Sequence, residues 1–114
     1  MGASILVVDD EPLILKTIER ALAKMGYRVA TAQNLSELQD QLVNAPFDLL
    51  LTDVYLEDAH ASDIIQKVRG VSPLVKVLRM SGSGSLAKGD DFIEKPFLID
   101  KLREKIRHVL HEPS

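Results

Sequence analysis

The chain has 114 residues, of which 46% are hydrophobic, and it carries a formal net charge of −3 with no cysteine. This length and apolar content predict one folded domain over residues 1–114, and exclude a disordered chain. The acidic balance argues against direct binding of nucleic acid. The lack of cysteine excludes disulfides and thiolate metal sites, and no apolar run reaches the ~20 residues of a membrane span, so we expect a cytoplasmic protein without a membrane segment.

Strand and helix patterns alternate through the first half of the chain. Residues 4–8 form a short apolar run that predicts a strand. Glu11-Pro12 opens a helix, because proline is tolerated in the first turn, and Gly26 is the expected residue just past its end. The next expected elements are a strand over 27–31 and a helix that Asn34 or Ser36 caps and that stops before Pro46.

The second half continues the same alternation. The expected elements are strands over 47–52, 74–80 and 91–94, a helix near 62–69 that Gly70 ends, and a last helix over 98–110. Strands that alternate with helices imply right-handed βαβ units around a parallel sheet. The predicted fold class is therefore α/β, with a single doubly wound, five-stranded parallel sheet.

One predicted crossover is too short for its usual helix. Only residues 82–89, rich in Gly and Ser, separate Ser81 from Asp90. A parallel crossover that contains a helix takes at least about 10–12 residues. We therefore predict a loop or a single turn here, so that the helix between the fourth and fifth strands is shortened or absent.

Four of the predicted strands end on residues that handle metal ions or phosphate. Asp9 and Asp10 follow the first strand, Asp53 follows the third, Ser81 the fourth and Lys95 the fifth. The carboxyl ends of parallel strands share one edge of the sheet, where ligands bind. Three carboxylates, a hydroxyl and an ammonium in one cleft suit Mg²⁺ and a phosphoryl group.

Each of these residues also has a plainer structural explanation. Asp10 and Glu11 could cap the first helix, and Asp53 could be an ordinary loop carboxylate. Ser81 could be a turn serine beside Gly82, and Lys95 a lysine held by Pro96. The occurrence of all these groups at successive strand ends favours the site over these separate explanations.

The same segments resemble the receiver domain of two-component response regulators over essentially the whole chain. The residues that carry the resemblance are Val7-Val8-Asp9-Asp10-Glu11-Pro12, Leu51-Thr52-Asp53-Val54, Met80-Ser81-Gly82 and Phe92-Ile93-Glu94-Lys95-Pro96-Phe97. The resemblance implies the flavodoxin-like strand order 2-1-3-4-5, which the handedness of the crossovers alone does not determine.

The resemblance also implies a role for each site residue. Asp53 would be the phosphoacceptor, with Ser81 bonded to a phosphoryl oxygen and Lys95 paired with it. Asp10 would bind Mg²⁺ directly and Asp9 largely through water. The backbone carbonyl of Tyr55 would be a further metal ligand, and the Lys95-Pro96 peptide bond would be cis. Phe92 would be the aromatic residue that changes rotamer on activation, although its plainer explanation is a core phenylalanine.

The implied function is a phosphorylation-switched signalling protein and not a turnover enzyme, although it could release its own phosphoryl group. Its donor would be a phosphohistidine on a sensor histidine kinase or a histidine phosphotransfer protein, and its output domain or partner stays open, as does a homodimer. Two alternatives remain. One is a receiver-like interaction module whose output is altered or independent of phosphorylation, because the fourth helix is lost. The other is a phosphatase, for which the residues offer no evident general base.

Overall fold

The computed structural model describes residues 2–54, 56, 58–82 and 91–111. Five parallel strands form one sheet in the order β2-β1-β3-β4-β5. The strands are β1 (Ser4–Val8), β2 (Arg28–Ala32), β3 (Leu49–Asp53), β4 (Lys76–Ser81) and β5 (Phe92–Glu94). The helices are α1 (Pro12–Ala23), α2 (Leu35–Gln41), α3 (Ala61–Val71) and α4 (Ile99–Val109), with a 3₁₀ turn, η1 (Leu42–Asn44), after α2. The predicted fold class and strand order are confirmed.

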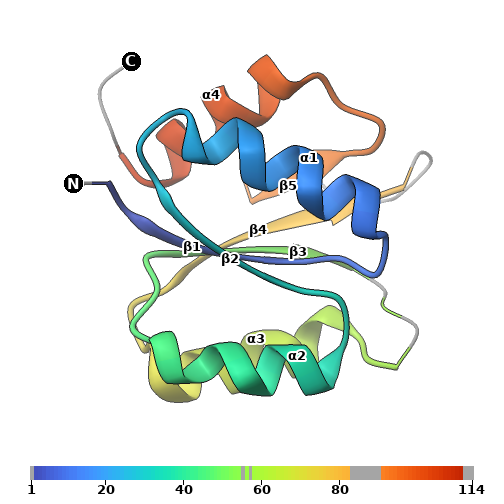
Figure 1. The fold of residues 1–114 in the computed structure, drawn as a ribbon, viewed down its shortest axis with the longest axis vertical. Coiled ribbons are helices and arrows are strands. Elements are labelled where there is room, and N and C mark those ends of the chain that lie inside the picture. Colours follow the sequence, from blue (N-terminus) through green and yellow to red (C-terminus); the bar gives the residue numbers. More distant parts are fainter. Residues whose placement is uncertain (1, 55, 57, 83–90, 112–114) are drawn as a thin grey trace.

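The sheet is the middle of three layers (Figure 1), with α1 and α4 on one face and α2 and α3 on the other. Side chains alternate across β1: Ile5 and Val7 pack in the cluster with α1 and α4, whereas Leu6 and Val8 pack in the cluster with α2 and α3. Because both faces are covered, the central strands are apolar at almost every position. This double burial fixes the strands whose ends carry the candidate site.

The helix ends follow local sequence signals in two cases. Asn34 caps α2, as one of the two predicted residues, and its side chain accepts a hydrogen bond from the backbone N–H of Glu37 at 2.9 Å. Gly26 adopts a φ of 91° after α1, a left-handed conformation that glycine reaches without the strain of a Cβ atom.

The predicted end of α3 at Gly70 is wrong. The helix continues through Gly70 to Val71 and stops at Ser72, the residue before Pro73. A residue that precedes proline is disfavoured in the helical region, so Pro73 is the effective stop. The Ser72 hydroxyl, which is buried, accepts a hydrogen bond from the backbone N–H of Phe47 at 2.8 Å and ties this helix end to the start of β3.

α2 ends at Gln41, and the 3₁₀ turn η1 covers most of the remainder of the helix that was predicted to stop before Pro46. The strand boundaries differ from the predicted ones by at most two residues. The strand predicted to begin at Tyr27 begins at Arg28, and the strand predicted to begin at Phe47 begins at Leu49. Strand ends are set by pairing: β2 starts where Arg28 lies opposite Ser4, the first residue of β1. The predicted loop or single turn between β4 and β5 falls on residues 83–90, which lie outside the described part of the chain.

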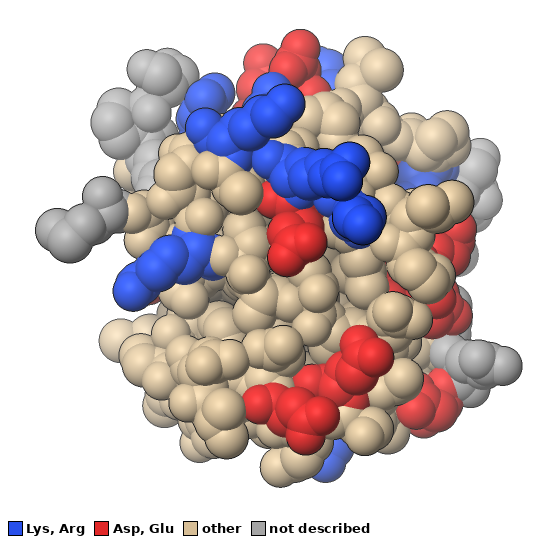
Figure 2. Space-filling view, in the orientation of Figure 1, with Lys and Arg blue, Asp and Glu red and all other residues tan. Residues whose placement is uncertain are grey.

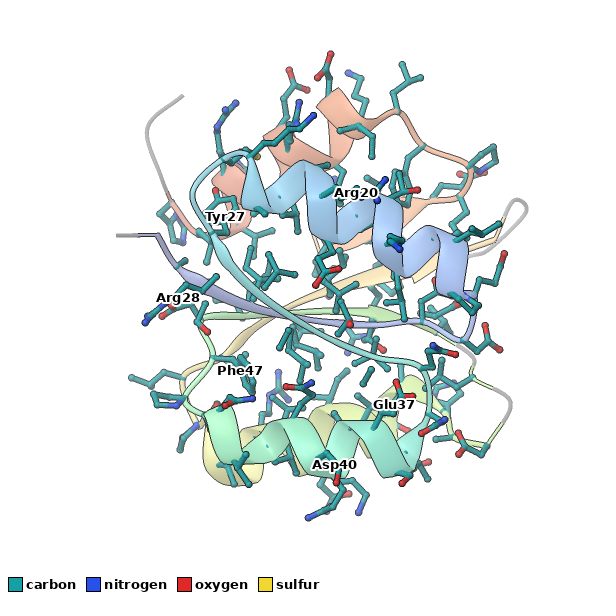
Figure 3. All side chains as sticks on the ribbon, viewed as in Figure 1. Arg20, Tyr27, Arg28, Glu37, Asp40 and Phe47 are labelled. Atoms are coloured by element: carbon teal, nitrogen blue, oxygen red, sulfur yellow. The ribbon has the colours of Figure 1, made fainter. Side chains whose placement is uncertain are left out.

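Charged side chains are unevenly distributed on the visible face of the molecule, along the β2 edge (Figure 2). Lys and Arg side chains gather over α1 and α4, whereas Asp and Glu side chains dominate the α2 side. Arg20 lies over α1, and Glu37 and Asp40 lie on α2 (Figure 3). Among the helices that the structure describes, none is long and apolar enough to cross a bilayer.

Candidate functional site

Three acidic residues from two strand ends converge at the carboxyl edge of the sheet. Asp9 and Asp10 directly follow β1, and Asp53 is the last residue of β3. One carboxylate oxygen from each lies within 4.8 Å of the others. Asp9 is fully buried, Asp53 is partly buried and Asp10 is exposed. These strands are neighbours in the sheet, with Val8 opposite Thr52, so the convergence follows directly from the topology.

Lys95 joins this cluster from the residue after β5. Its Nζ atom lies 2.7 Å from Oδ2 of Asp9 and 2.9 Å from Oδ2 of Asp53. Partial burial of the ammonium lowers the pKa of Lys95, but hydrogen bonds and attraction from Asp9 and Asp53 outweigh it, so the pKa is raised above its usual 10.5. Lys95 is therefore a permanent cation at neutral pH, and it holds two carboxylates at once.

Ser81 lies at the end of β4, between the strands that supply Asp53 and Lys95. Its side chain is buried, and its carbonyl oxygen accepts a hydrogen bond from the backbone N–H of Lys95 at 2.6 Å. Asp53 is paired with Met80 in the β3–β4 register, one residue before Ser81. The Lys95–Pro96 peptide bond is cis, which is the isomer that the resemblance implies.

The donor set of this cluster fits a hard divalent cation. Its oxygen atoms are the ligands that Mg²⁺ prefers, and Mg²⁺ needs few protein ligands because it retains several waters. One ammonium faces three carboxylates, so a divalent cation would relieve the remaining repulsion. Tyr55, whose carbonyl the resemblance implies as a further ligand, lies outside the described residues.

Asp10 and Glu11 do not cap α1 through their side chains, which was the alternative explanation for these two residues. Glu11 is the N-cap residue, but its side chain makes no capping hydrogen bond, and α1 has no acidic residue in its first turn. Instead the Asp9 carboxylate accepts a hydrogen bond from the backbone N–H of Glu11 at 2.9 Å through Oδ1. The buried Asp9 thus links Lys95 to the start of α1, while Asp10 extends toward solvent.

Phe92, the implied switch aromatic, takes part in a contact that the sequence analysis missed. Phe92 is partly buried, and the guanidinium carbon of Arg79 lies 5.4 Å from the centre of its ring. Arg79 also forms an ion pair with Asp91, with 2.9 Å between Nη1 and Oδ2. No local pattern along β4 indicates this contact, because it depends on the β4–β5 register, in which Arg79 lies opposite Phe92.

His60 has a structural role at the start of α3. It is the N-cap residue of α3, and its Nδ1 atom accepts a hydrogen bond from the backbone N–H of Ser62 at 3.1 Å. This capping contact gives His60 a structural role at the start of α3.

The arrangement can support chemistry on phosphate. Asp53 combines a partly exposed carboxylate with a cation at hydrogen-bond distance, which suits a nucleophile that must meet an anionic group. Buried Asp9 orients Lys95 from the other side. The result is a carboxylate beside a fixed positive charge and a set of metal-binding oxygens, all held by strand ends.

The comparisons with known proteins agree with this geometry. The sequence model for the response regulator receiver domain matches residues 5–107. The chain is 34% identical over 113 residues to the response regulator protein PilR of Pseudomonas aeruginosa, with 92% of this chain and 25% of PilR covered. It is 33% identical over 113 residues to the nisin biosynthesis regulatory protein NisR of Lactococcus lactis, with 93% of this chain and 49% of NisR covered. The chain thus spans between a quarter and a half of the length of these curated relatives.

Solved structures show the same fold. A CheY-like receiver domain protein from Methanospirillum hungatei aligns with a TM-score of 0.82 at 28% identity, covering 97% of this chain and 95% of that one. NtrX from Brucella abortus aligns with a TM-score of 0.84 at 25% identity, covering 97% of this chain and 27% of that one. Together with the five-stranded sheet and the convergence of Asp9, Asp53 and Lys95, these matches establish that the chain belongs to the receiver-domain family of two-component response regulators.

Proposed function

We propose that this receiver domain accepts a phosphoryl group on Asp53 in an Mg²⁺-dependent reaction. The observation that supports the proposal best is the double ion pair of Lys95 with Asp9 and Asp53, because it places a fixed cation beside a partly exposed carboxylate. The phosphoryl donor would be a phosphohistidine of a sensor histidine kinase or of a histidine phosphotransfer protein, as the family implies.

In the proposed step a carboxylate oxygen of Asp53 attacks the phosphorus atom of the phosphohistidine. The new O–P bond forms as the P–N bond breaks, and the electron pair of that bond stays on the imidazole nitrogen of the donor. Lys95 turns from the Asp53 carboxylate to an oxygen of the transferred group, and the Ser81 hydroxyl donates a hydrogen bond to another.

Asp9, Asp10 and Asp53 would hold the metal, with the carbonyl of Tyr55 as a further ligand. Bound Mg²⁺ supplies positive charge that neutralises the equatorial oxygens of the transferred group. The residues of the chain contribute orientation: the buried Asp9 holds Lys95, and the strand end holds Asp53. As part of the same proposal the chain works in the cytoplasm, as a switch and not as a turnover enzyme.

Output partners belong to the same proposal. The relatives that the chain matches include NtrC of Rhizobium meliloti, a DNA-binding transcriptional regulator at 32% identity, of which this chain spans 25%. A receiver of this kind would pass its phosphorylation state to an output domain or to a separate protein.

Mass spectrometry of the intact protein tests the phosphoacceptor. After incubation with a small phosphodonor and Mg²⁺, the wild-type chain should gain the mass of one phosphoryl group, and Asp53→Asn should gain none. The matched control is Asp40→Asn, since Asp40 is an exposed carboxylate on α2 (Figure 3) and is not part of the acidic cluster. That variant should be phosphorylated like the wild type.

Three results would contradict the proposal. Wild type without any gain of mass would exclude the acceptor chemistry and favour a phosphorylation-independent interaction module. An equal gain in Asp53→Asn would place the phosphoryl group on another residue. Chelation of Mg²⁺ should abolish the gain in wild type, so a gain that survives chelation would remove the metal from the reaction.

A further inference from the structure

A groove lies beside the first half of β4, at the opposite end of that strand from Ser81. Its volume is about 450 Å³, and it is bounded by the ends of α3 and α4 and by Asp91 before β5. Three permanent cations line it: Arg69, Lys76 and Arg79. This cationic groove shares no lining residue with the phosphoacceptor site.

The positive charge of the cationic groove is only partly compensated. Asp91 is the one carboxylate in its described lining, and it is paired with Arg79. The side chains of Arg69 and Lys76 are exposed, and in the part of the chain that the structure describes they form no hydrogen bond or ion pair. On a chain with a net charge of −3, this is a local excess of positive charge.

Among the described residues, part of the sheet edge in the same groove has no strand neighbour. β4 has six residues, but β5 has three and pairs only with Arg79, Met80 and Ser81. Lys76, Val77 and Leu78 therefore have no strand neighbour on this side among the described residues. The open half of the edge can receive another strand.

The direction of the open backbone groups follows from the observed hydrogen bonds. The N–H of Arg79 donates to the carbonyl of Asp91 at 2.8 Å, so the backbone groups of Arg79 point toward β5. Residues two apart along a strand point to the same side. The N–H and carbonyl groups of Val77 therefore face the cationic groove, with Val75 and Val109 as its apolar lining.

We propose that the cationic groove binds an extended, acidic peptide segment of a partner protein. The segment would continue the line of β5, pair its backbone with Val77, and place carboxylates near Arg69 and Lys76. Apolar residues between its acids would rest on the valines. The combination of open strand edge and uncompensated cations selects this occupant, because neither feature alone requires a peptide that is both extended and acidic.

A second copy of this chain matches the groove less well. Many exposed acids of the described chain lie on helices, as Glu37 and Asp40 do on α2 (Figure 3), and Glu94 lies on β5, a strand of only three residues. A helix has its backbone groups engaged internally, so it cannot pair with the open edge of β4. Nucleic acid offers negative charge but no peptide backbone. The test below distinguishes the peptide from a second copy of the chain and from nucleic acid.

Fluorescence anisotropy with a labelled short peptide in which Glu and Val alternate tests the proposal. We expect the wild-type chain to bind it, and Arg69→Glu combined with Lys76→Glu to weaken binding by about tenfold or more, since two attractions become repulsions. The matched control is Lys67→Glu, which changes another exposed cation, on α3, that does not line the cationic groove. Its effect should be less than about twofold.

Backbone pairing is tested separately from charge. A peptide that is N-methylated at alternate residues on its pairing edge should lose binding, and the amide resonance of Val77 should show one of the largest shifts with the unmodified peptide. Equal binding of the methylated peptide, of an alternating Lys-Val peptide, or of a short oligonucleotide would overturn the proposal. Concentration-dependent self-association that the peptide does not inhibit would also overturn the proposal. The same holds if Lys67→Glu weakens peptide binding as much as the combined Arg69→Glu and Lys76→Glu change.

Discussion

At the scale of single residues, Lys95 organises the site. It is the group that contacts both the buried Asp9 and the phosphoacceptor candidate Asp53. Because its pKa is raised by folding, these ion pairs stabilise the fold fully at pH values below 10.5, and the contribution is lost as the pH rises through the still higher folded-state pKa. The site is thus built in its charged form at neutral pH.

Replacing Lys95 by Met should destabilise the metal-free protein. The change removes the ammonium but keeps an unbranched side chain, and it leaves the fully buried Asp9 without its cation. We expect the free energy of unfolding to fall by about 2 kcal/mol, less than for a fully buried pair because Lys95 and Asp53 retain 18% and 17% exposure. Urea unfolding at neutral pH measures this. Lys67→Met, on the surface of α3, should change stability little, and an unchanged Lys95→Met would show that the ion pairs contribute nothing.

Asp10 should oppose folding without metal and support it with metal. One ammonium faces three carboxylates, so Asp10→Asn removes repulsion and should raise the Tm of the metal-free protein by roughly 2 °C, given how exposed Asp10 is. Added Mg²⁺ should raise the Tm of the wild type, and much less that of Asp10→Asn. Thermal unfolding with and without Mg²⁺ measures both effects, with Asp63→Asn on α3 as control. Equal Mg²⁺ shifts in wild type and Asp10→Asn would remove Asp10 from the metal site.

At the scale of elements, apolar periodicity predicted every strand and helix of the described chain, with boundaries within a few residues. One signal was misinterpreted in α3, where Gly70 was taken as the end although it lies inside the helix. A glycine near the end of an apolar pattern indicates a stop only when the chain must turn into the left-handed region. Gly26 does so, with a φ of 91°, and Gly70 does not.

Alanine at the two glycines should therefore have opposite effects. Gly70 is helical and exposed, and an added Cβ atom would meet nothing within 4 Å, so Gly70→Ala should raise the free energy of unfolding by about 0.5–1 kcal/mol. Gly26 also has open space, but its φ is positive, so Gly26→Ala should lower the free energy of unfolding by about 1 kcal/mol. Denaturant unfolding of both variants checks the signs. A shift of both in the same direction would contradict this account of the two helix ends.

At the scale of the whole molecule, one sheet joins two cores. Leu50 and Leu51 are neighbours in the central strand β3 and are both fully buried. Leu50 packs in the cluster with α2 and α3, whereas Leu51 packs in the cluster with α1 and α4. The strand ends that carry the site are fixed in position because both hydrophobic clusters pack against the same strands.

Truncating either leucine should weaken the molecule as one unit. Leu50→Ala and Leu51→Ala should each lower the free energy of unfolding by about 2–5 kcal/mol, and unfolding should stay a single transition. Unfolding of both helix layers can be followed as a function of urea concentration by circular dichroism and by amide hydrogen exchange. Val43→Ala, where the side chain is 84% exposed, is the control and should be near neutral. Two separate transitions would show that the layers are independent.

The sequence by itself determined the fold class, the order of the elements and the polar residue at each strand end. These follow from local periodicity, and from the rule that parallel strands share a carboxyl edge. The family resemblance added the strand order and the roles proposed for Asp53, Asp10 and Lys95.

Only the tertiary structure decided which oxygens meet. Lys95 bonds Asp9 across 86 residues of sequence, and no local pattern records such a contact. The structure also decided that Asp9 and not Asp10 is buried, and that Arg79 pairs with Asp91 over Phe92. The open edge of β4 beside Arg69 and Lys76 likewise depends on how many residues of β5 pair, which is a property of the assembled sheet. Distances, burial and unpaired strand edges depend on how the elements pack against one another. Local sequence patterns do not contain this information, because the packing joins residues that are far apart in the chain.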